Sequence, residues 1–257
     1  MIRVFSRKWN FFVHGTGISR PELDRPHQSP GLREILADRY LKGSGIEFGA
    51  LNYPLSVPQG VTVTYADLQR GESLRQLFSE VGHIREPDII TDIESMRGIR
   101  DDSQDFVIAN HVLEHVEDPL RALKAINRVL RPTGIAYLTL PDKRFTFDRD
   151  RQLTPLSHLL KDHREGPLGS LLVHYEEWCR CVDHLEGDEG SRKIAAMLEQ
   201  RANIHFHVWD YPEMAIMFAY VARHAEFAFE IEASVLNGIE VIWILRKRSP
   251  SSRPELP

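Results

Sequence analysis

The stretch from Asp105 to Leu140 constrains the fold more than any other part of the chain. Its apolar run Phe106 to Ala109 has the length of a strand that is buried on both faces of a parallel sheet. Asp118 and Pro119 have the pattern of a helix N-cap followed by proline at the first helical position. A second apolar run, Gly134 to Leu140, predicts the next buried strand. The stretch is therefore expected to form a strand, a long polar loop, a helix and a parallel strand.

The polar loop in this unit has the position of a binding site. In open α/β sheets, ligands bind at the carboxyl ends of the strands, where such loops emerge. The loop runs from Asn110 to Asp118 and contains two histidines. The helix that follows has an apolar stripe at helical spacing, which predicts that it covers one face of the sheet. The stripe consists of Leu120, Ala122, Leu123, Ile126, Val129 and Leu130.

Composition and charge argue against several classes of protein. The 257 residues are enough for one large core, or for one core with a sizeable insertion. A net charge of −5 without a basic face is untypical of a nucleic-acid-binding protein, so we expect no nucleic-acid partner. The two cysteines, Cys179 and Cys181, are too close together to cross-link the fold, which fits a reducing compartment. Because no apolar run reaches the roughly 20 residues that span a bilayer and no secretory leader is evident, we expect a cytoplasmic protein without a transmembrane segment.

The first strand pattern, Gly45 to Phe48, leads into a loop that differs from a dinucleotide-binding loop. Glu47 holds an acidic position, and Gly49 and Ala50 follow it. The further glycines of a G-x-G-x-x-G motif are absent, so the loop does not offer the bare backbone amides that a pyrophosphate requires. The loop fits a ligand without phosphate, or a turn that binds nothing.

Two further strand patterns bring acidic residues to the same edge. The alternating, β-branched run Val61 to Asp67 ends in an aspartate, 18 positions after Gly49. A carboxylate at that point can accept hydrogen bonds from both hydroxyls of a ribose, although a solvent-facing turn aspartate has the same pattern. Asp88 to Ile93 predicts another strand, and Leu74 to Val81 predicts a helix between the two.

The run "DFVIANHVLEHVEDPLRALKAINRVLRPTGIAYLTLP" resembles the fourth strand, loop, helix and fifth strand of class I S-adenosylmethionine (SAM) dependent methyltransferases. The likeness is greatest to the methyltransferase type 11 group, and within it to members associated with bacterial glycan biosynthesis. It is specific over about residues 45–141 and weaker over the C-terminal strands. It implies an α/β fold: a Rossmann-like, seven-stranded, mostly parallel sheet with an antiparallel last strand, plus a helical insertion after strand five.

The resemblance also implies a cofactor, S-adenosyl-L-methionine, and the residues that hold it. Asp67 takes the place of the ribose ligand, Asp92 lies near the adenine amino group, and Ile93 flanks the adenine ring. The complete set of expected cofactor-binding residues is Glu47, Gly49, Ala50, Asp67, Asp92, Ile93, Asn110 and His111.

The chain divides into five parts on this basis. Residues 1–30 are an irregular N-terminal segment that the resemblance assigns to a lid over the cofactor pocket, and residues 31–141 are the SAM-binding α/β core, opening with a helix at 31–40. Residues 142–204 are an insertion that covers the substrate, and residues 205–248 complete the core. Residues 249–257 are a polar, proline-rich tail that we expect to be disordered.

The insertion is expected to be helical and to recognise the substrate. Thr154 and Pro155 have the pattern of an N-cap and first helical residue, opening a helix through Leu160, and residues 171–182 predict a second helix. Charged residues gather just after strand five, and their carboxylate and guanidinium groups can bind the hydroxyls of a substrate. A solvated salt-bridge network explains these charges as well. The residues are Arg144, Asp148, Arg149, Asp150 and Arg151. The candidate substrate residues are Asp142, Arg144, Tyr175 and Trp178.

The C-terminal part shows three consecutive patterns. Ile204 to Trp209 alternates, so His205 and His207 share one face if this segment is extended. Residues 210–213 form a capping-box pattern before a helix at 214–224. Asn237-Gly238 between two apolar runs is the strongest short-range signal of a β-hairpin.

Six of the twelve histidines lie between His158 and His207. This clustering fits acid–base chemistry, a metal site or a polar cap. A metal needs three or four converging ligands, and no H-E-x-x-H or paired-carboxylate motif is present, so we expect no metal site.

Methyl transfer to an alcohol requires a general base within hydrogen-bond reach, and histidine suits this role near neutral pH. The candidate bases, in order of preference, are His207, His115, His205 and His111. We expect a SAM-dependent methyltransferase that acts on a hydroxyl of a saccharide or glycolipid intermediate. The alternatives are C- or O-methylation of a quinone-like or other small metabolite, and a non-catalytic methyltransferase fold that binds a partner. The sequence does not indicate the oligomeric state.

Overall fold

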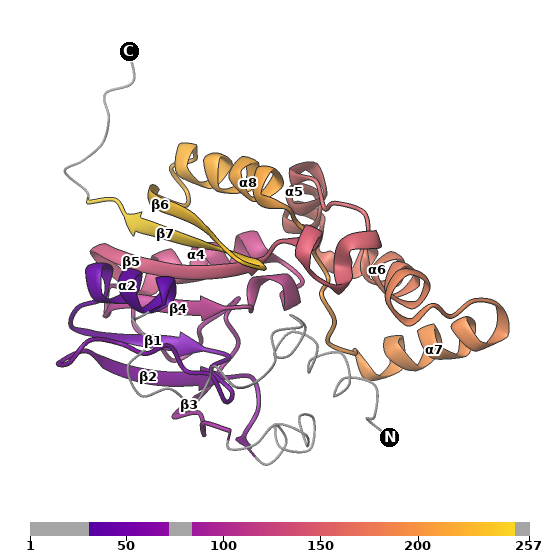
Figure 1. The fold of residues 1–257 in the computed structure, drawn as a ribbon, viewed down its shortest axis with the longest axis horizontal. Coiled ribbons are helices and arrows are strands. Elements are labelled where there is room, and N and C mark those ends of the chain that lie inside the picture. Colours follow the sequence, from indigo (N-terminus) through magenta and orange to yellow (C-terminus); the bar gives the residue numbers. More distant parts are fainter. Residues whose placement is uncertain (1–30, 72–83, 250–257) are drawn as a thin grey trace.

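The computed structural model describes residues 31–71 and 84–249, and these form a seven-stranded sheet with helices on both faces (Figure 1). The strand order is β3-β2-β1-β4-β5-β7-β6. The first five strands are parallel, and β7 is antiparallel to both β5 and β6. The strands are β1 (Ser44–Phe48), β2 (Thr62–Asp67), β3 (Ile89–Ile90), β4 (Gln104–Asn110), β5 (Leu130–Pro141), β6 (Phe229–Asn237) and β7 (Glu240–Lys247). The predicted fold class is confirmed.

Six α-helices accompany these strands within the described residues. They are α2 (Leu32–Tyr40), α4 (Pro119–Val129), α5 (Leu156–Glu165), α6 (Leu171–Trp178), α7 (Gly187–Gln200) and α8 (Tyr211–Arg223). Short 3-10 helices occupy Leu113–His115, Lys143–Phe145, Phe147–Asp150 and Pro167–Gly169, and a π-helical turn, Cys179–Asp183, follows α6. The predicted lid, the predicted helix at 74–81 and residues 250–257 of the tail lie outside the described residues.

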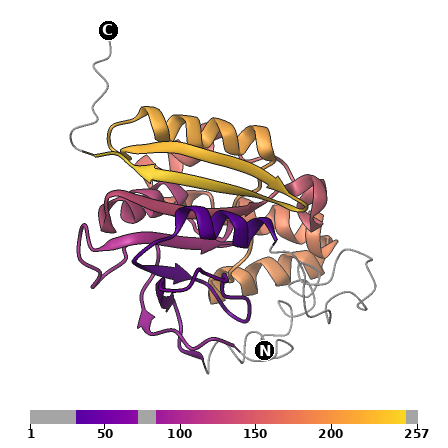
Figure 2. The same ribbon diagram turned by 60° about the vertical axis from the view of Figure 1, so that its left-hand side comes forward.

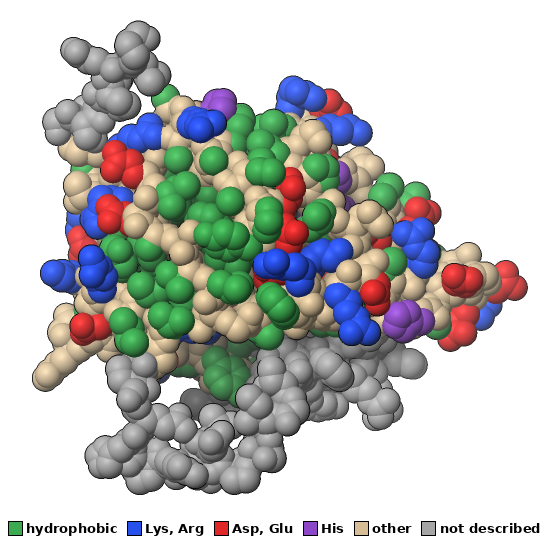
Figure 3. Space-filling view, turned by 45° about the horizontal axis from the view of Figure 1, so that its top comes forward, with side chains coloured by type: hydrophobic (Ala, Val, Ile, Leu, Met, Phe, Trp, Pro, Cys, Tyr) green, Lys and Arg blue, Asp and Glu red, His purple; other side chains and the backbone are tan. Residues whose placement is uncertain are grey.

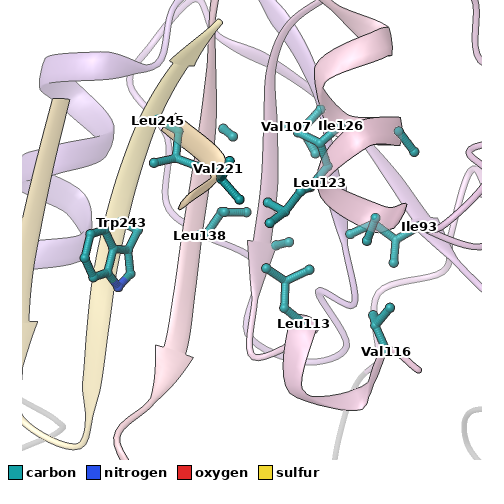
Figure 4. Close-up of a cluster of buried hydrophobic side chains, with 14 of the residues drawn as sticks. Ile93, Val107, Leu113, Val116, Leu123, Ile126, Leu138, Val221, Trp243 and Leu245 are labelled. Carbon is teal, nitrogen blue, oxygen red and sulfur yellow. The ribbon is translucent and has the colours of Figure 1, made fainter. Parts of the chain in front are cut away.

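The sheet is buried on both faces because alternate residues of its central strands enter two different cores. Val107 and Ala109 of β4 face one core, where helices α4 and α8 pack on the sheet (Figure 4). Phe106 and Ile108 face the other core, which contains Leu36 and other residues of α2. Figure 2 shows α2 lying across the sheet on the side opposite α8.

The face that carries α2 is partly apolar at its surface. Figure 3 shows hydrophobic side chains gathered on one side of the molecule. Leu32 and Ile35 of α2 are 38% and 49% exposed, whereas Leu36 and Ala37 are buried. Helix α2 therefore contacts the sheet through Leu36 and Ala37 and leaves Leu32 and Ile35 at the surface.

Local signals set the ends of several elements. The Asp118 carboxylate accepts a hydrogen bond from the Arg121 amide at the start of α4, and Asp210 does the same for the Glu213 amide in α8. Gly238, with φ of 63°, supplies the left-handed residue of the β6–β7 turn. The N-cap predicted at Thr154 is wrong, because its hydroxyl accepts a hydrogen bond from the Val208 amide and α5 begins only at Leu156.

Helices α5, α6 and α7 form a cap beyond the carboxyl ends of the parallel strands (Figure 1). The cap has a small core of its own, consisting of Leu171, Tyr175, Trp178, Cys179, Val182, Met197, Ile204 and Phe206. Helix α7 was not expected, since Gly187 and Gly190 lower the helix propensity at its start. Across residues 31–71 and 84–249, none of the helices combines the length and apolar character needed to span a membrane.

Candidate active site

A cavity of about 350 Å³ opens at the carboxyl ends of β1 and β4. This volume is within the usual range for small-molecule sites. The described residues that line the cavity are Arg33, Glu47, Gly49, Ala50, Leu51, Asn52, Tyr53, Asn110, His111, Glu114, His205, Ile239 and Glu240. Five of the eight predicted cofactor residues are among them, so the structure brings the β1 loop and the β4 loop to one site.

The loop after β1 lies close to the loop after β4. Gly49 has φ of 66°, and a Cβ atom at this position would lie 2.9 Å from a methyl group of Val112. Glycine is therefore required here both by the backbone conformation and by the space available. Residues 49–53 consequently run along the cavity wall.

Glu47 brings a buried carboxylate to the cavity. It accepts a hydrogen bond of 2.9 Å from the Leu55 amide and is 1% exposed. Burial raises the pKa of Glu47 to about 7, although the Leu55 amide and the Arg33 guanidinium oppose the shift. A cationic group bound in the cavity would lower this pKa and stabilise the carboxylate.

The side-chain amide of Asn110 has no hydrogen-bond partner among the described residues. Both the Oδ1 and Nδ2 atoms are shielded from solvent, and neither hydrogen-bonds to any residue in the described part of the chain. The Oδ1 atom of Asn52, on the opposite loop, is in the same situation. Because buried amides are normally paired, these atoms have the character of ligand-binding groups.

Asp67 and Asp92 lie next to this cavity in the fold but do not line it. Asp67 ends β2, which pairs with β1, so it is at the same sheet edge as Asn110. Its Oδ1 atom accepts a hydrogen bond of 2.7 Å from the Leu68 amide, and burial raises its pKa. Asp92 accepts hydrogen bonds from the Ser95 amide and hydroxyl. Ile93 is 6% exposed and belongs to the core on the α4 side, which does not fit the expectation that it flanks an adenine ring.

His111 lies within a network of charged groups at the cavity wall. Its Nε2 atom is 2.7 Å from Glu240, and its Nδ1 atom is 3.3 Å from Glu114. Arg33 donates hydrogen bonds to both oxygens of the same Glu240 carboxylate. Burial alone would lower the pKa of His111, but the two carboxylates raise it to about 9. His111 is thus protonated near neutral pH and cannot accept a proton from a substrate.

His205 is the second candidate base that lines the cavity. Its Nδ1 atom lies 2.7 Å from Oδ2 of Asp148, and both side chains are 2% exposed. Arg151 donates a hydrogen bond of 2.9 Å to Oδ1 of the same carboxylate and one of 2.7 Å to the His205 carbonyl oxygen. Burial opposes ionisation of Asp148, but His205 and Arg151 together lower its pKa. The ionised Asp148 therefore fixes the orientation of the His205 ring.

His115 lies behind His205 and does not line the cavity. The two rings meet edge to face with centroids 4.6 Å apart. The Nδ1 atom of His115 is 2.9 Å from Oδ1 of Asn203 and 3.0 Å from the Ile204 carbonyl oxygen. Burial, and secondarily the neighbouring His205, lowers the pKa of His115 to about 4.

His207, the preferred general base in the sequence analysis, does not line the cavity. It is 1% exposed, and its ring meets those of His158 and His174 at centroid distances of 5.6 and 5.3 Å. The preference for His207 over His205 therefore does not fit the structure. Ile204 and Phe206 enter the cap core, and the segment between Asn203 and Trp209 forms no strand of the sheet.

The four candidate substrate residues are not among the described residues that line the cavity. Asp142 is completely buried and forms an ion pair of 2.6 Å with Arg144. Tyr175 is also completely buried, and its hydroxyl donates to the Ala202 carbonyl oxygen. Trp178 packs edge to face on Phe147 within the cap. As placed, these residues shape the cap and do not touch the cavity.

Sequence reasoning missed several residues of the site. Arg33, Asn52, Tyr53, Glu114, Ile239 and Glu240 line the cavity without having been predicted. Glu114 is completely buried, an unusual state for a carboxylate, but its neighbours in sequence give no sign of burial. The position of Glu240 directly after the hairpin turn was the one available signal, since that turn returns to the sheet edge.

Residues 43–138 match the family model of a methyltransferase domain. The match extends from just before β1 into β5, and so includes both loops that form the cavity wall. No curated protein sequence matches the chain.

Solved structures resemble the whole fold at low sequence identity. One, from Rhodobacter sphaeroides and described as "Putative Zn-dependent Alcohol Dehydrogenases", has a TM-score of 0.53 and 15% identity, covering 86% of this chain and 92% of that one. A SAM-dependent methyltransferase from Methanosarcina mazei has a TM-score of 0.46 and 15% identity, covering 85% and 99%. A SAM-dependent methyltransferase, possible histamine N-methyltransferase, from Thermotoga maritima has a TM-score of 0.45 and 14% identity, covering 96% and 100%.

The methyltransferase domain indicates a SAM-dependent methyltransferase, and it implies S-adenosyl-L-methionine as the cofactor. The residues present fit that molecule. It carries an ammonium group, which suits the Glu47 carboxylate, and hydrogen-bonding groups, which suit the unpaired amide of Asn110. It has no phosphate and therefore does not need the glycines that the β1 loop lacks.

Proposed function

We propose that this protein transfers a methyl group to a hydroxyl of a saccharide or glycolipid intermediate, with His205 as the general base. The observation that carries the proposal is the contact of 2.7 Å between Asp148 and Nδ1 of His205, at a ring that lines the cavity. When Nδ1 carries the proton and donates to Asp148, the neutral imidazole has its lone pair on Nε2. That nitrogen can accept a hydroxyl proton as the oxygen is methylated.

Bound S-adenosylmethionine supplies an electrophilic methyl group that carries its own leaving group. The protein then has to hold the acceptor in line and exclude water. We assign Gly49 and Glu47 to the binding of the methionine end, and Asn110 to a hydrogen bond with the cofactor. Asp67 and Asp92, at the neighbouring strand ends, are assigned to the nucleoside end.

A base is needed for an alcohol, whereas many carbon and amine acceptors need none. The presence of an oriented Asp–His pair therefore supports a hydroxyl acceptor. The groups around the cavity support a polyhydroxylated acceptor, because guanidinium, carboxylate and amide groups such as those of Arg33, Glu240 and Asn52 can hydrogen-bond to hydroxyls. Tyr53, 56% exposed beside them, offers a ring on which a sugar face can pack.

The proposal is tested by supplying methyl-labelled SAM and a glycan extract to the purified protein and identifying the labelled product. We expect the label on a saccharide oxygen. His205→Gln should lower turnover by about 10²–10⁴-fold, the usual contribution of a general base, while S-adenosylhomocysteine binds as before. His224→Gln, at the exposed end of α8, is the matched control and should leave turnover unchanged.

Two outcomes would contradict the proposal in different ways. Full activity of His205→Gln, or a label on carbon, would remove the assigned base and the acceptor class. S-adenosylhomocysteine binding without transfer to any acceptor in the extract would favour a non-catalytic binding protein.

A further inference from the structure

Three imidazoles from three different segments converge inside the cap, away from the cavity. They belong to His158 of α5, His174 of α6 and His207 of the segment that precedes α8. One ring nitrogen of each lies within 4.8 Å of those of the other two. His174 and His207 are 9% and 1% exposed, whereas His158 is half-buried at the edge of the group. The methyltransferase chemistry described above uses none of the three.

His207 directs a vacant ring nitrogen into the protein interior. Its Nε2 atom lies 3.2 Å from the Glu117 carbonyl oxygen, to which it donates a hydrogen bond. Its Nδ1 atom then carries the lone pair, and this atom is buried and unpaired within the described residues. A metal-binding histidine typically donates its other N–H to a backbone carbonyl in this way, because that bond fixes the tautomer and the ring orientation.

His158 shows a second sign of coordination. Its Nε2 atom is 3.2 Å from Nε2 of His174 and 3.1 Å from Oδ2 of Asp162. One ring nitrogen has a single direction in which to bond, so it cannot form a good hydrogen bond to both neighbours. Oδ2 of Asp162 is in fact buried without hydrogen-bond geometry to any described residue.

These short separations match the edges of a coordination polyhedron. Ligands about 2.0–2.1 Å from a tetrahedral Zn²⁺ ion are separated from one another by roughly 3.3–3.4 Å. The distances from His158 to His174 and Asp162 are close to this value. The other oxygen of Asp162 accepts a hydrogen bond of 2.5 Å from the Ser170 hydroxyl, an arrangement typical of a supported ligand.

The donor set also suits a divalent transition metal ion. Neutral imidazole is the ligand form, and it suits Zn²⁺ and other divalent transition metals.

We propose that His158, His174 and His207 bind a divalent transition metal ion of the Zn²⁺ class, with the Asp162 carboxylate beside them as the fourth ligand. The ion joins helices α5 and α6 to the segment that ends in Trp209, and so links the cap to the segment that carries His205. Its role is structural, because the three ligands lie outside the cavity lining.

The first test is the metal content of wild-type protein, prepared without a metal-affinity column and dialysed. We expect inductively coupled plasma mass spectrometry to find about one Zn²⁺ per chain. After removal of zinc by a chelator, Co²⁺ should restore one equivalent and give the strong visible absorption of a four-coordinate site. Wild-type protein that retains no ion and shows no such Co²⁺ spectrum would overturn the proposal.

Variants then locate the ion. His174→Gln and His207→Gln should lose the metal and the Co²⁺ absorption. His184→Asn, an exposed histidine in the same cap with φ of 56°, should keep both, since asparagine tolerates this conformation. If a ligand variant does not fold, the Co²⁺ spectrum of the wild type and of His115→Gln, which alters only the second group, together still decide the question.

A second group at the cavity, Glu114, His115 and His205, also has ligand atoms within 4.8 Å of one another. There Glu114 pairs with His111, and Nδ1 of His115 contacts Asn203. His115→Gln should therefore retain the ion. Loss of metal from His115→Gln with retention in His174→Gln would place the ion at the cavity and refute the proposal.

Discussion

Nδ1 of His205 lies 2.7 Å from Oδ2 of Asp148, although the two residues are 57 positions apart and both are buried. Arg151 holds Asp148 from the other side. Asp148 comes from the chain that leaves β5, and His205 comes from the chain that returns from the cap. The chain between these two residues forms the cap and returns to the edge of the cavity.

The first prediction concerns the orienting carboxylate. Asp148→Asn should lower turnover by about 10²-fold or more, because a neutral amide no longer selects the tautomer with Nδ1 protonated. The affinity for S-adenosylhomocysteine should not change. Steady-state kinetics and calorimetry measure the two effects separately. Asp150→Asn, at an exposed position nearby, is the control, and equal losses in the two variants would refute an orienting role.

The second prediction concerns Asn110. Asn110→Ala should weaken S-adenosylhomocysteine binding by about 1–3 kcal/mol, the usual cost of losing a buried hydrogen-bonding partner. The free energy of unfolding should barely change, since the amide makes no hydrogen bond to the described residues. Asn127→Ala should show the reverse pattern, because its amide donates to the Ala228 carbonyl oxygen far from the cavity. Unchanged binding by Asn110→Ala would remove this residue from the cofactor site.

The third prediction is a pH dependence that arises from Glu47. Burial raises the pKa of Glu47 from 4.5 to about 7, so the folded protein binds this proton more tightly than the unfolded chain does. The contribution of Glu47 to the free energy of unfolding is therefore greatest below about pH 4.5 and is lost as the pH rises to about 7. The full loss is roughly 3 kcal/mol.

Denaturant unfolding of wild type and Glu47→Gln across this pH range measures the effect. The difference in unfolding free energy between the two proteins should change steadily in favour of Glu47→Gln up to about pH 7 and then stay constant. Parallel curves for the two proteins would show that Glu47 titrates normally.

The fourth prediction concerns the pair His111 and Glu240. Burial lowers the pKa of His111, but the neighbouring carboxylates of Glu114 and Glu240 outweigh it and raise this pKa to about 9. The stability that His111 contributes is therefore present below its ordinary pKa of 6.5 and lost as the pH rises through about 9. Glu240→Gln should lower the pKa of His111, as measured by the pH dependence of its ring resonances in NMR. Glu232→Gln, whose carboxylate pairs with Arg246 on the hairpin surface, should leave it unchanged. An unaltered His111 titration in Glu240→Gln would mean that Glu240 is not its main partner.

The sheet could be predicted from sequence because its signals are local. The apolar runs of β4 and β5, the Asp118 cap and the Asn237-Gly238 turn each specify a structure within a few residues, and all of them are present. The positions of Glu47, Gly49 and Asn110 followed from the resemblance, since each ends a strand at one edge.

The contacts that complete the site could not be predicted, because they join distant parts of the chain. Arg33 meets Glu240 across 207 positions, and His111 meets Glu240 across 129. The choice between His205 and His207 likewise depends on how three cap helices pack. Neither periodicity nor a helix cap contains that information.

The segment from Ile204 to Trp209 serves three environments with one simple alternation. Its odd-numbered side chains supply the imidazole at the cavity, the imidazole in the buried triad and an indole in the main core, while Ile204 and Phe206 fill the cap. The alternation of this hexapeptide thus determines which environment each imidazole enters. Deletion of Ile204, with the preceding chain held in place, would put the phenyl group of Phe206 in the place of the His205 ring and the Val208 side chain in the place of the His207 ring. Both the proposed base and the triad would then be lost in one step.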